Sequence, residues 1–438
     1  MFDSAPPRFI PLLALCAGVL LGVPSESGAQ RLTAEEQRIH DNVLANNAGA
    51  VALLERVVSI NSGTLNSEGV REVGTVFMEE LDKLGFITRW ITLPAGIERG
   101  GHLFATRQGN RGKRLVLIGH LDTVFEKDSP FQRFEIKGDT AYGPGASDMK
   151  GGDVVIVYAL KALHDAGLLD RTTITVALIG DEERPGGDIA IVRGDLIEAA
   201  GRSDVALGFE GSVGANNATV ARRGSSGWTL TTTGKAGHSG RIFSDTYGSG
   251  AIFEAARILN AFREEVRGPE YLTFNPGLML GGTTVSYDAA NARGEAFGKS
   301  NVIPQSVVVN GGLRFISEEQ KEQARAKMRQ IVAQNLPQTS AEISFRDSYP
   351  AMSPKPANDS LLTIYDEGSR ALGYGPITPL DPGERGAADI SFVADQLAAL
   401  SGIGPHGRGA HSFEDQLYLK SIPVATARAA LLIYRLTR

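Results

Sequence analysis

RLVLIGHLDTV at residues 114–124 and KGDTAYGPGASDMKGG at residues 137–152 are the two segments that decide the fold of this chain. The first begins with an apolar run that predicts a buried strand, and His120 and Asp122 follow where that strand ends. The second holds Asp148 in a glycine-rich turn that leads into a helix. One imidazole and two carboxylates are groups that bind a divalent metal, and glycines let the backbone lie close to the ion. These segments therefore predict the beginning of a metal site.

The composition is that of a soluble globular protein with more than one domain. The chain has 438 residues, of which 42% are apolar and 21% are charged. This length exceeds what one ordinary hydrophobic core supports, so at least two domains are expected. The formal net charge of -6 argues against nucleic acid or an anionic membrane surface as a partner, because both favour a basic protein surface.

The first 29 residues have the pattern of a cleaved signal peptide. Arg8 precedes an apolar run at 9–23, and small residues follow at 27–29. The run is short for a membrane span, so we expect a periplasmic or secreted protein that is free of the membrane after cleavage. A lipoprotein signal at Cys16 is the alternative, but bulky Leu15 precedes this cysteine. Since Cys16 is the only cysteine, the mature chain would have no disulfide and no thiolate ligand.

Strand and helix patterns alternate along the first half of the chain. Apolar strand patterns occur at 88–93, 102–106, 115–118, 173–179 and 205–209, and helical patterns occur within 32–84 and at 151–166. This alternation predicts an α/β fold with a mainly parallel sheet covered by helices on both faces. Ligands of such sheets bind beyond the carboxyl ends of the strands.

Acidic residues follow two further strands at this same edge. One strand runs directly into Glu182 and Glu183, and the next runs into Glu210. A single acidic pair after a strand is most often a solvated turn. Three strands that each end in metal-binding or acid–base groups favour a functional site instead.

The middle of the chain has a different pattern. The alternating stretches WTLTTTG, TTVSY and VVVNGGLRF accompany two helical stretches at 251–266 and 318–335. Short strands with two helices on one face predict a compact α+β module inserted into the first domain. That domain then resumes with helices expected at 387–400 and 424–436, and His406 and His411 lie in the loop between them.

Several common catalytic motifs are absent from the sequence. It contains no G-x-S-x-G, no Walker A sequence and no H-E-x-x-H. Residues 402–407 satisfy G-x-G-x-x-G, but they follow no early strand and begin no helix at the required place, so a dinucleotide site is not indicated.

Five motifs in order, GHLDTV, GPGASDMKGG, DEERPGG, GFEGS and GAHSFED, resemble the M20 family of co-catalytic zinc peptidases, of the glutamate-carboxypeptidase and aminoacylase type. The resemblance covers essentially the whole mature chain, and the inserted module matches the lid domain of the family. It implies catalytic-domain segments at 30–223 and 348–438 and a lid and dimerisation domain at 224–347.

The resemblance implies two metal sites that share one carboxylate. Asp148 would bridge two Zn²⁺ ions in each subunit, with His120 and Glu210 completing one site and Glu183 and His411 the other. Two cations roughly 3.5 to 4 Å apart lower the pKa of a shared water and polarise the scissile carbonyl. Ligands without thiolate suit zinc, and cobalt or manganese would also fit such a set.

The resemblance also gives two nearby carboxylates separate roles. Asp122 would accept the other N–H of the His120 imidazole and fix its tautomer. Glu182 would be the general base, which takes a proton from the water and hands it to the leaving amine. Its pKa should therefore lie above that of an exposed glutamate.

In the lid, GKAGHSG, GKSNVIP and GGLRF supply His238, Asn301 and Arg314. The resemblance implies that His238 reaches the active site of the partner subunit in a homodimer and polarises the oxyanion. Asn301 and Arg314 would bind the substrate carboxylate, for which a planar guanidinium is well suited. Of the other histidines, His406 is a candidate for substrate contact, whereas His40, His102 and His164 are expected to be structural.

The expected substrate is a small peptide or N-acyl amino acid from which a C-terminal amino acid is released, with glutamate as one candidate. Glu210 at its ligand position and the export signal resemble the glutamate-carboxypeptidase type, but ERGAADIS at 384–391 departs from it and leaves side-chain specificity open. An aminopeptidase or dipeptidase acting on free amines is the alternative enzyme. A non-catalytic exported metal-dependent binding protein would require loss of a ligand or the base, and no such loss is visible.

Overall fold

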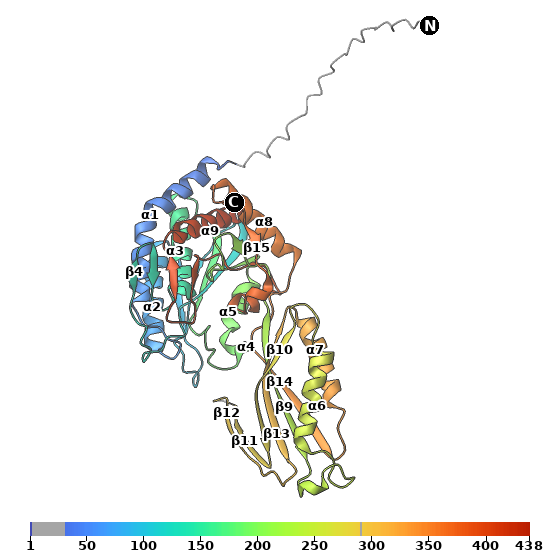
Figure 1. The fold of residues 1–438 in the computed structure, drawn as a ribbon. Helices are drawn as coiled ribbons and strands as arrows, with labels where there is room; N and C mark the ends of the chain where they lie inside the picture. Colours follow the sequence, from blue (N-terminus) through green and yellow to red (C-terminus); the bar gives the residue numbers. More distant parts are fainter. Residues whose placement is uncertain (2–30, 290) are drawn as a thin grey trace.

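The computed structural model describes Met1 and residues 31–289 and 291–438, which form an α/β domain and a smaller module projecting from it (Figure 1). Apart from Met1, the predicted signal peptide at 1–29 lies outside the described residues. No helix within the described ranges is long and apolar enough to cross a bilayer.

A six-stranded sheet forms the centre of the α/β domain, in the order β1-β2-β6-β3-β7-β16. Strands β6, β3, β7 and β16 are parallel to one another, and β1 and β2 are antiparallel additions at one edge. The strands are β1 (Ile87–Ile91), β2 (His102–Arg107), β3 (Arg111–His120), β6 (Thr172–Ile179), β7 (Val205–Gly208) and β16 (Ala398–Leu400). The prediction of a mainly parallel sheet is confirmed.

Helices cover both faces of this sheet because its strands bury alternate residues on opposite sides. Leu115 and Leu117 of β3 belong to the core beneath the long helices, whereas Val116 and Ile118 belong to the core on the other face. The first core is covered by α1 (Ala34–Val58), α2 (Ser67–Lys83), α3 (Gly151–Asp165), α8 (Pro356–Ala371) and α9 (Ser421–Thr437), and the second by α5 (Gly194–Gly201) and the turn η4 (Asp389–Phe392).

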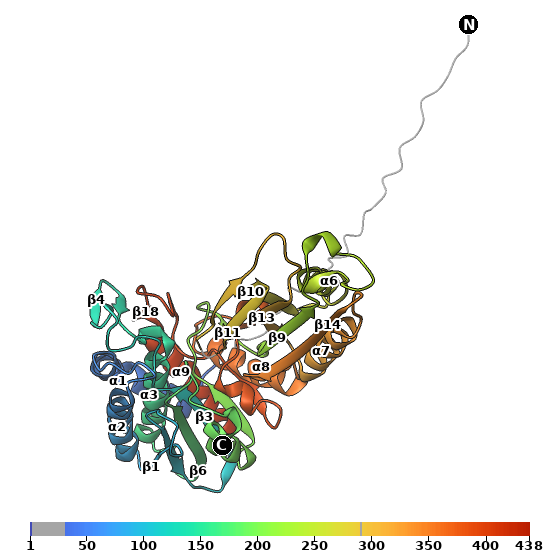
Figure 2. The same cartoon turned by 90° about the horizontal axis from the view of Figure 1, so that it is seen from below.

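The inserted module is a four-stranded antiparallel sheet with two helices on one face (Figures 1 and 2). Its sheet order is β10-β13-β9-β14, and Trp228, Phe262 and Met328 are buried between sheet and helices. The elements are β9 (Gly224–Gly234), α6 (Gly250–Glu265), β10 (Thr273–Gly282), β13 (Ser306–Phe315), α7 (Glu318–Val332) and β14 (Thr339–Asp347), with a hairpin of β11 (Thr284–Asp288) and β12 (Arg293–Phe297).

Short strands join distant parts of the α/β domain. The four-stranded sheet β17-β18-β5-β4 pairs Leu417 with Ala141, so the loop that carries His411 lies against the segment before Asp148. The remaining short elements are β4 (Glu135–Lys137), β5 (Thr140–Tyr142), β17 (Gly407–Arg408), β18 (Gln416–Tyr418), the pair β8 (Asn217–Ala218) and β15 (Thr378–Pro379), and α4 (Ile189–Val192).

The prediction of a helix at 387–400 is wrong. The segment is a short 3-10 turn at Asp389–Phe392 followed by strand β16, in which Ala398 pairs with Val205 of β7. Its apolar residues fit a helix or a buried strand equally well in sequence, and pairing with the free edge of β7 decides between them. Helix α8 was missed, although Pro356 at its first turn and buried Leu361 and Tyr365 form a recognisable helical pattern.

Candidate metal centre

The carboxyl ends of three neighbouring strands bring candidate ligands together. His120 is the last residue of β3, and it pairs with Ile179 at the end of β6. The residues after β6 include Glu183, and Glu210 follows β7, which runs parallel to β3 on its other side. Adjacent parallel strands end at the same edge, so local sequence alone places these three side chains in one region.

Asp148 lies between two groups of possible metal ligands. One of its carboxylate oxygens is 3.3 Å from His120 Nε2, and the other is 3.2 Å from His411 Nε2. Glu210 Oε1 is 3.7 Å from His120 Nε2, and Glu183 Oε2 is 3.0 Å from His411 Nε2. Two triads, His120–Asp148–Glu210 and Asp148–Glu183–His411, therefore share one carboxylate, and the candidate ligand atoms of each lie within 4.8 Å of one another. The structure brings together all five residues that the sequence proposed as ligands.

The donor atoms of these triads fit a cation. His120 Nε2 and Glu183 Oε1 are buried, and neither has a hydrogen-bond partner among the described residues. Buried polar atoms rarely lack a partner. A bound cation would explain why these two atoms have no hydrogen-bond partner in the protein. Imidazole and carboxylate groups without thiolate are a donor set that zinc accepts.

The electrostatics of the triads point the same way. Burial raises the pKa of Glu183 to about 7, against the opposing hydrogen bond from His411. Hydrogen bonds to Asp148 and Glu183 raise the pKa of His411 to about 11. Burial would raise the pKa of Asp148, but the two imidazoles close to its carboxylate outweigh burial and lower it. The three acidic side chains of the triads, Asp148, Glu183 and Glu210, lie close together and therefore favour a positive charge between them.

Asp415 holds the loops that carry Asp148 and His411, a role that the sequence reasoning missed. Its carboxylate accepts hydrogen bonds from the backbone N–H groups of Gly145 (2.8 Å) and Ser147 (3.0 Å) and from the Ser147 hydroxyl (2.6 Å). Gly145 has φ +76°, which favours glycine in this turn. The only sequence signal was the final position of Asp415 in GAHSFED.

The carboxylate of Asp122 lies closer to the backbone of the segment after β6 than to the His120 imidazole. Its two carboxylate oxygens accept from the backbone N–H groups of Glu182 (3.0 Å) and Glu183 (3.1 Å), and one also accepts from the Thr64 hydroxyl (2.6 Å). The Nδ1 atom of His120 lies 3.0 Å from the main-chain oxygen of Asp122 and 3.5 Å from its carboxylate. The carbonyl oxygen is thus the nearer acceptor for the imidazole N–H.

Glu182 lies next to the ligands without belonging to either triad. Burial raises its pKa well above the ordinary value, and the neighbouring carboxylates Asp389, Glu210 and Glu183 raise it further against the charge of His120. Its carbonyl oxygen accepts a hydrogen bond from the Tyr349 hydroxyl at 2.7 Å. A raised pKa at this position is what a general base needs.

A buried arginine supports the start of this acidic segment. Arg193 donates to Asp181 Oδ1 and to Asp389 Oδ1, both at 2.6 Å, and its side chain is fully buried. It also donates to the Tyr349 hydroxyl at 3.2 Å. Through these bonds Arg193 joins the residue before Glu182 to the turn η4.

The three lid residues do not meet the triads within one chain. His238 is bridged to Val302, and Ser239 N donates to the main-chain oxygen of Asn301, so His238 and Asn301 lie together. Arg314 is an exposed residue of β13. No hydrogen bond or ion pair found among the described residues joins any of the three to the ligands.

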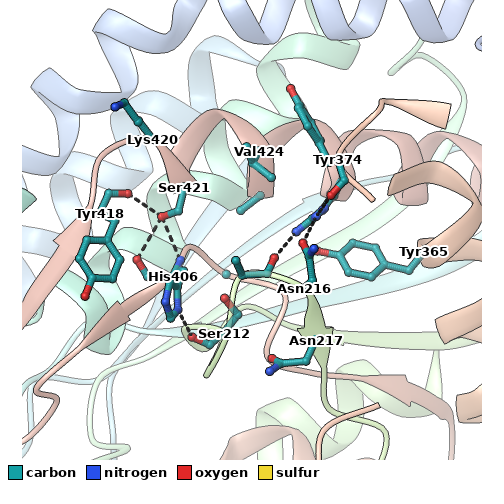
Figure 3. A pocket seen from close by; sticks show the side chains of 14 residues that line it. Ser212, Asn216, Asn217, Tyr365, Tyr374, His406, Tyr418, Lys420, Ser421 and Val424 are labelled. Carbon is teal, nitrogen blue, oxygen red and sulfur yellow. Dashed lines mark hydrogen bonds between the residues drawn. The ribbon is translucent and has the colours of Figure 1, made fainter. Parts of the chain in front are cut away.

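His406 faces a different cavity from the triads. Its Nδ1 atom is 3.1 Å from the main-chain oxygen of Ser212, and its ring lies 5.1 Å from that of Tyr418 (Figure 3). Together with α8 and α9 residues these groups line a cavity of about 320 Å³. The cavity beside the triads, of about 280 Å³, is lined by Asp148 and Glu210 and does not include His406. Substrate contact by His406 is therefore not favoured.

Comparisons with known proteins agree with this arrangement. The sequence model of peptidase family M20/M25/M40 matches residues 116–435. Carboxypeptidase G2 from a Pseudomonas species is 30% identical over 409 residues, covering 90% of this chain and 92% of that protein. A succinyl-diaminopimelate desuccinylase from a Janthinobacterium species is 26% identical over 388 residues, covering 85% and 95%. The crystal structure of aminopeptidase PepT from Bacillus cereus has a TM-score of 0.73 at 16% identity, covering 90% and 99%, a likeness of fold.

The fold, the shared-carboxylate triads and these matches define a hydrolase of the metallopeptidase class. The chain belongs to peptidase family M20/M25/M40. The match extends from β3 into α9 and so includes both parts of the α/β domain and the inserted module. The family resemblance drawn from the five motifs, and the expectation of an enzyme, are confirmed.

Proposed function

We propose that this hydrolase cleaves an amide or peptide bond and releases a C-terminal amino acid from a small peptide or an N-acyl amino acid. The observation that carries the proposal is the pair of ligand triads sharing Asp148, with Glu182 beside them. The similarity to carboxypeptidase G2 over most of both chains supports a carboxypeptidase rather than an aminopeptidase.

The two triads would hold two Zn²⁺ ions in each subunit, for which cobalt or manganese could substitute. His120 and Glu210 would complete one site, Glu183 and His411 the other, and Asp148 would belong to both. When bound, the two cations supply positive charge that activates a water and polarises the scissile carbonyl. The protein's part is to hold five side chains in place, and Asp415 and Asp122 act through the backbone of the ligand loops.

Glu182 would move the proton. Its carboxylate accepts a proton from the attacking water and passes it to the leaving amine nitrogen, and the raised pKa that burial produces suits both transfers. Asp122 would be a positioning residue. It holds the backbone N–H groups of Glu182 and Glu183, so the base and one ligand keep a fixed relation to each other.

The lid residues would act after assembly of a homodimer. Asn301 and Arg314 would bind the C-terminal carboxylate of the substrate, and His238 would stabilise the oxyanion in the partner subunit's active site. Because no hydrogen bond or ion pair found in the described part of the chain joins His238 or Asn301 to the triads, we expect full activity only in a dimer. Sedimentation combined with activity measurements at decreasing protein concentration tests this expectation. A monomer that hydrolyses at the full rate contradicts it.

Metal analysis together with a substrate panel tests the function itself. The panel contains N-acetyl dipeptides and N-acyl amino acids, the same dipeptides with a free amine, and peptides amidated at the C-terminus. We expect hydrolysis of the N-blocked substrates, loss of hydrolysis on C-terminal amidation, and loss of all activity with a chelator that zinc then reverses. A requirement for a free amine favours an aminopeptidase or dipeptidase. Metal binding without hydrolysis of any member favours the non-catalytic binding protein.

A further inference from the structure

We propose that Arg385 forms an anion subsite in the catalytic domain, which binds a second carboxylate of the substrate beside the metal centre. The inference rests on the proposed function and narrows it to substrates that carry two acidic groups. Arg385 lies in ERGAADIS at 384–391. This is the segment that departs from the glutamate-carboxypeptidase type, which the sequence otherwise resembles.

Arg385 and the metal ligands line the same cavity. This cavity has a volume of about 280 Å³, and Asp148, Glu210 and Arg385 all contribute to its wall. The Arg385 side chain is only 15% exposed. A group in the cavity can therefore contact the guanidinium and the metal centre at the same time.

The guanidinium of Arg385 has N–H donors without an acceptor. Its Nε and Nη2 atoms are buried, and neither has a hydrogen-bond partner among the described residues. The nearest acid is Glu210, whose Oε2 is 3.6 Å from Nη2, longer than a hydrogen bond. An unpaired buried donor is unfavourable, especially on a charged group. A carboxylate in the cavity, which Arg385 lines, would supply an acceptor to the exposed part of this guanidinium.

Glu210 is a poor permanent partner for this arginine. Its other carboxylate oxygen points to the His120 side of the triad, where Oε1 lies 3.7 Å from Nε2 of that imidazole. A carboxylate that is needed as a metal ligand has less charge to offer a neighbouring cation. The positive charge of Arg385 is consequently available to a substrate.

A second arginine fixes the segment that carries Arg385. Arg222 is buried and donates from Nε to the carbonyl oxygen of Gly386 (2.8 Å) and from Nη2 to that of Ala387 (3.3 Å). Burial lowers the pKa of Arg222 to about 10, and the charge of Arg385 adds to this effect. The two guanidinium groups therefore create a positive field at the cavity wall. Arg222 thus donates to two main-chain oxygens and, from Nη1, to the Ser401 hydroxyl (3.1 Å), whereas no hydrogen bond from the Arg385 side chain is found among the described residues.

The chemistry of the ligand follows from the guanidinium. A planar fork of N–H donors binds a carboxylate through two parallel hydrogen bonds. The proposed function assigns the C-terminal carboxylate to Arg314 of the lid, so a different carboxylate would contact Arg385. It belongs to the side chain of the released amino acid, as in glutamate, or to the far end of a dicarboxylic acyl group, as in a succinyl group.

Two matched substrate pairs distinguish these sources. N-acetylglutamate and N-acetylglutamine differ only in the side chain of the released residue, and N-succinyl-leucine and N-succinamoyl-leucine differ only in the acyl group. We expect the parent enzyme to prefer the acidic member of one pair by about 10- to 100-fold in kcat/KM. Arg385→Gln should abolish this preference, and Arg385→Lys, which keeps the charge but loses the fork, should restore part of it.

Arg408→Gln is the matched control, because Arg408 lines the same cavity but is exposed. If Arg385 acts as a specific subsite, the control keeps the preference for the acidic substrate. An equal loss of preference in both variants indicates a general electrostatic field and contradicts the proposal. An equal fall of kcat/KM for both members of a pair in Arg385→Gln indicates that Arg385 positions Glu210 and also contradicts it.

Calorimetric titration with glutarate tests the subsite without turnover, with butyrate as the monocarboxylate control. We expect Arg385→Gln to weaken glutarate binding by about 10-fold or more and to leave butyrate binding nearly unchanged. If the parent protein hydrolyses neither these four substrates nor any member of the substrate panel described above, yet shows this difference, the proposed function fails and the anion subsite stands. If it hydrolyses them without an acidic preference, and glutarate binds both proteins equally, only the subsite is rejected.

Discussion

Glu182→Gln is expected to keep its metals and to lose about 10²- to 10⁴-fold in kcat, the range that general acid–base catalysis contributes. Glutamine has the size of glutamate but cannot accept the proton of the attacking water. The Glu182 side chain belongs to neither ligand triad, so the metal sites should be intact. The backbone N–H that donates to Asp122 also remains. Metal content by mass spectrometry and steady-state rates on the best substrate of the panel measure both quantities.

Glu414→Gln is the control for Glu182→Gln. Glu414 is an exposed acid in the loop that carries His411, and no hydrogen bond of its side chain is found among the described residues. It should keep both the metals and the parent rate. A Glu182→Gln enzyme that binds metal and still works within a few-fold of the parent rate would show that Glu182 is not the base. Loss of metal would assign Glu182 to the ligands instead.

The part of the site that follows strand ends could be predicted from local sequence. His120 is the last residue of β3, Glu183 and Glu210 follow soon after β6 and β7, and parallel neighbours end at one edge. His411 is different, because it lies 263 residues after Asp148 in the chain (411 minus 148). Only the order of the five motifs connected the two residues in sequence. Their proximity depends on pairing between β5 and β18, whose three-residue strands carry little pattern.

The lid shows why some elements escaped the sequence reasoning. Strands β9 and β13 lie in the interior of its sheet and bury alternate residues such as Leu230 and Val309, which gives a strong strand pattern. The edge strands β10 and β14 were not named. Gly282 is their one fully buried residue, although β14 alternates half-buried Ala341, Ile343 and Phe345 with exposed residues. The direction in which the Arg385 side chain points could not be predicted from the sequence either. Nothing in ERGAADIS indicates that Arg385 faces the metal centre, because main-chain bonds from Arg222 set that geometry.

The contacts of Asp122 show a second limit of prediction from sequence. A carboxylate two residues after a ligand histidine was expected to accept the imidazole N–H. In the structure the main-chain oxygen of Asp122 is nearer to His120 Nδ1, and the carboxylate holds the backbone of Glu182 and Glu183. A residue type and its spacing can predict that a group belongs to a site. Which of its oxygens faces which donor depends on backbone direction, which spacing does not define.

Asp148→Asn is expected to lose metal from both sites, whereas His411→Ala should lose metal from one. Asp148 offers one carboxylate oxygen to each triad, at 3.3 Å from His120 Nε2 and 3.2 Å from His411 Nε2. Asparagine keeps the shape but has one oxygen and no charge, so neither site keeps an anionic bridge. The loss of affinity should exceed the about 10- to 100-fold that follows removal of an outer hydrogen-bonding partner. Activity should fall with the metal content.

Metal content after dialysis, measured per chain, separates the two variants. If Asp148 is shared, we expect about two ions in the parent protein, about one in His411→Ala and less than one in Asp148→Asn. Asp139→Asn is the matched control, because Asp139 is an exposed acid of the same segment that pairs with Lys420. A firmly bound single ion in Asp148→Asn would place this carboxylate in one site only. The second triad would then need another bridging group, and the glycine-rich turn at 143–152 would serve a single metal.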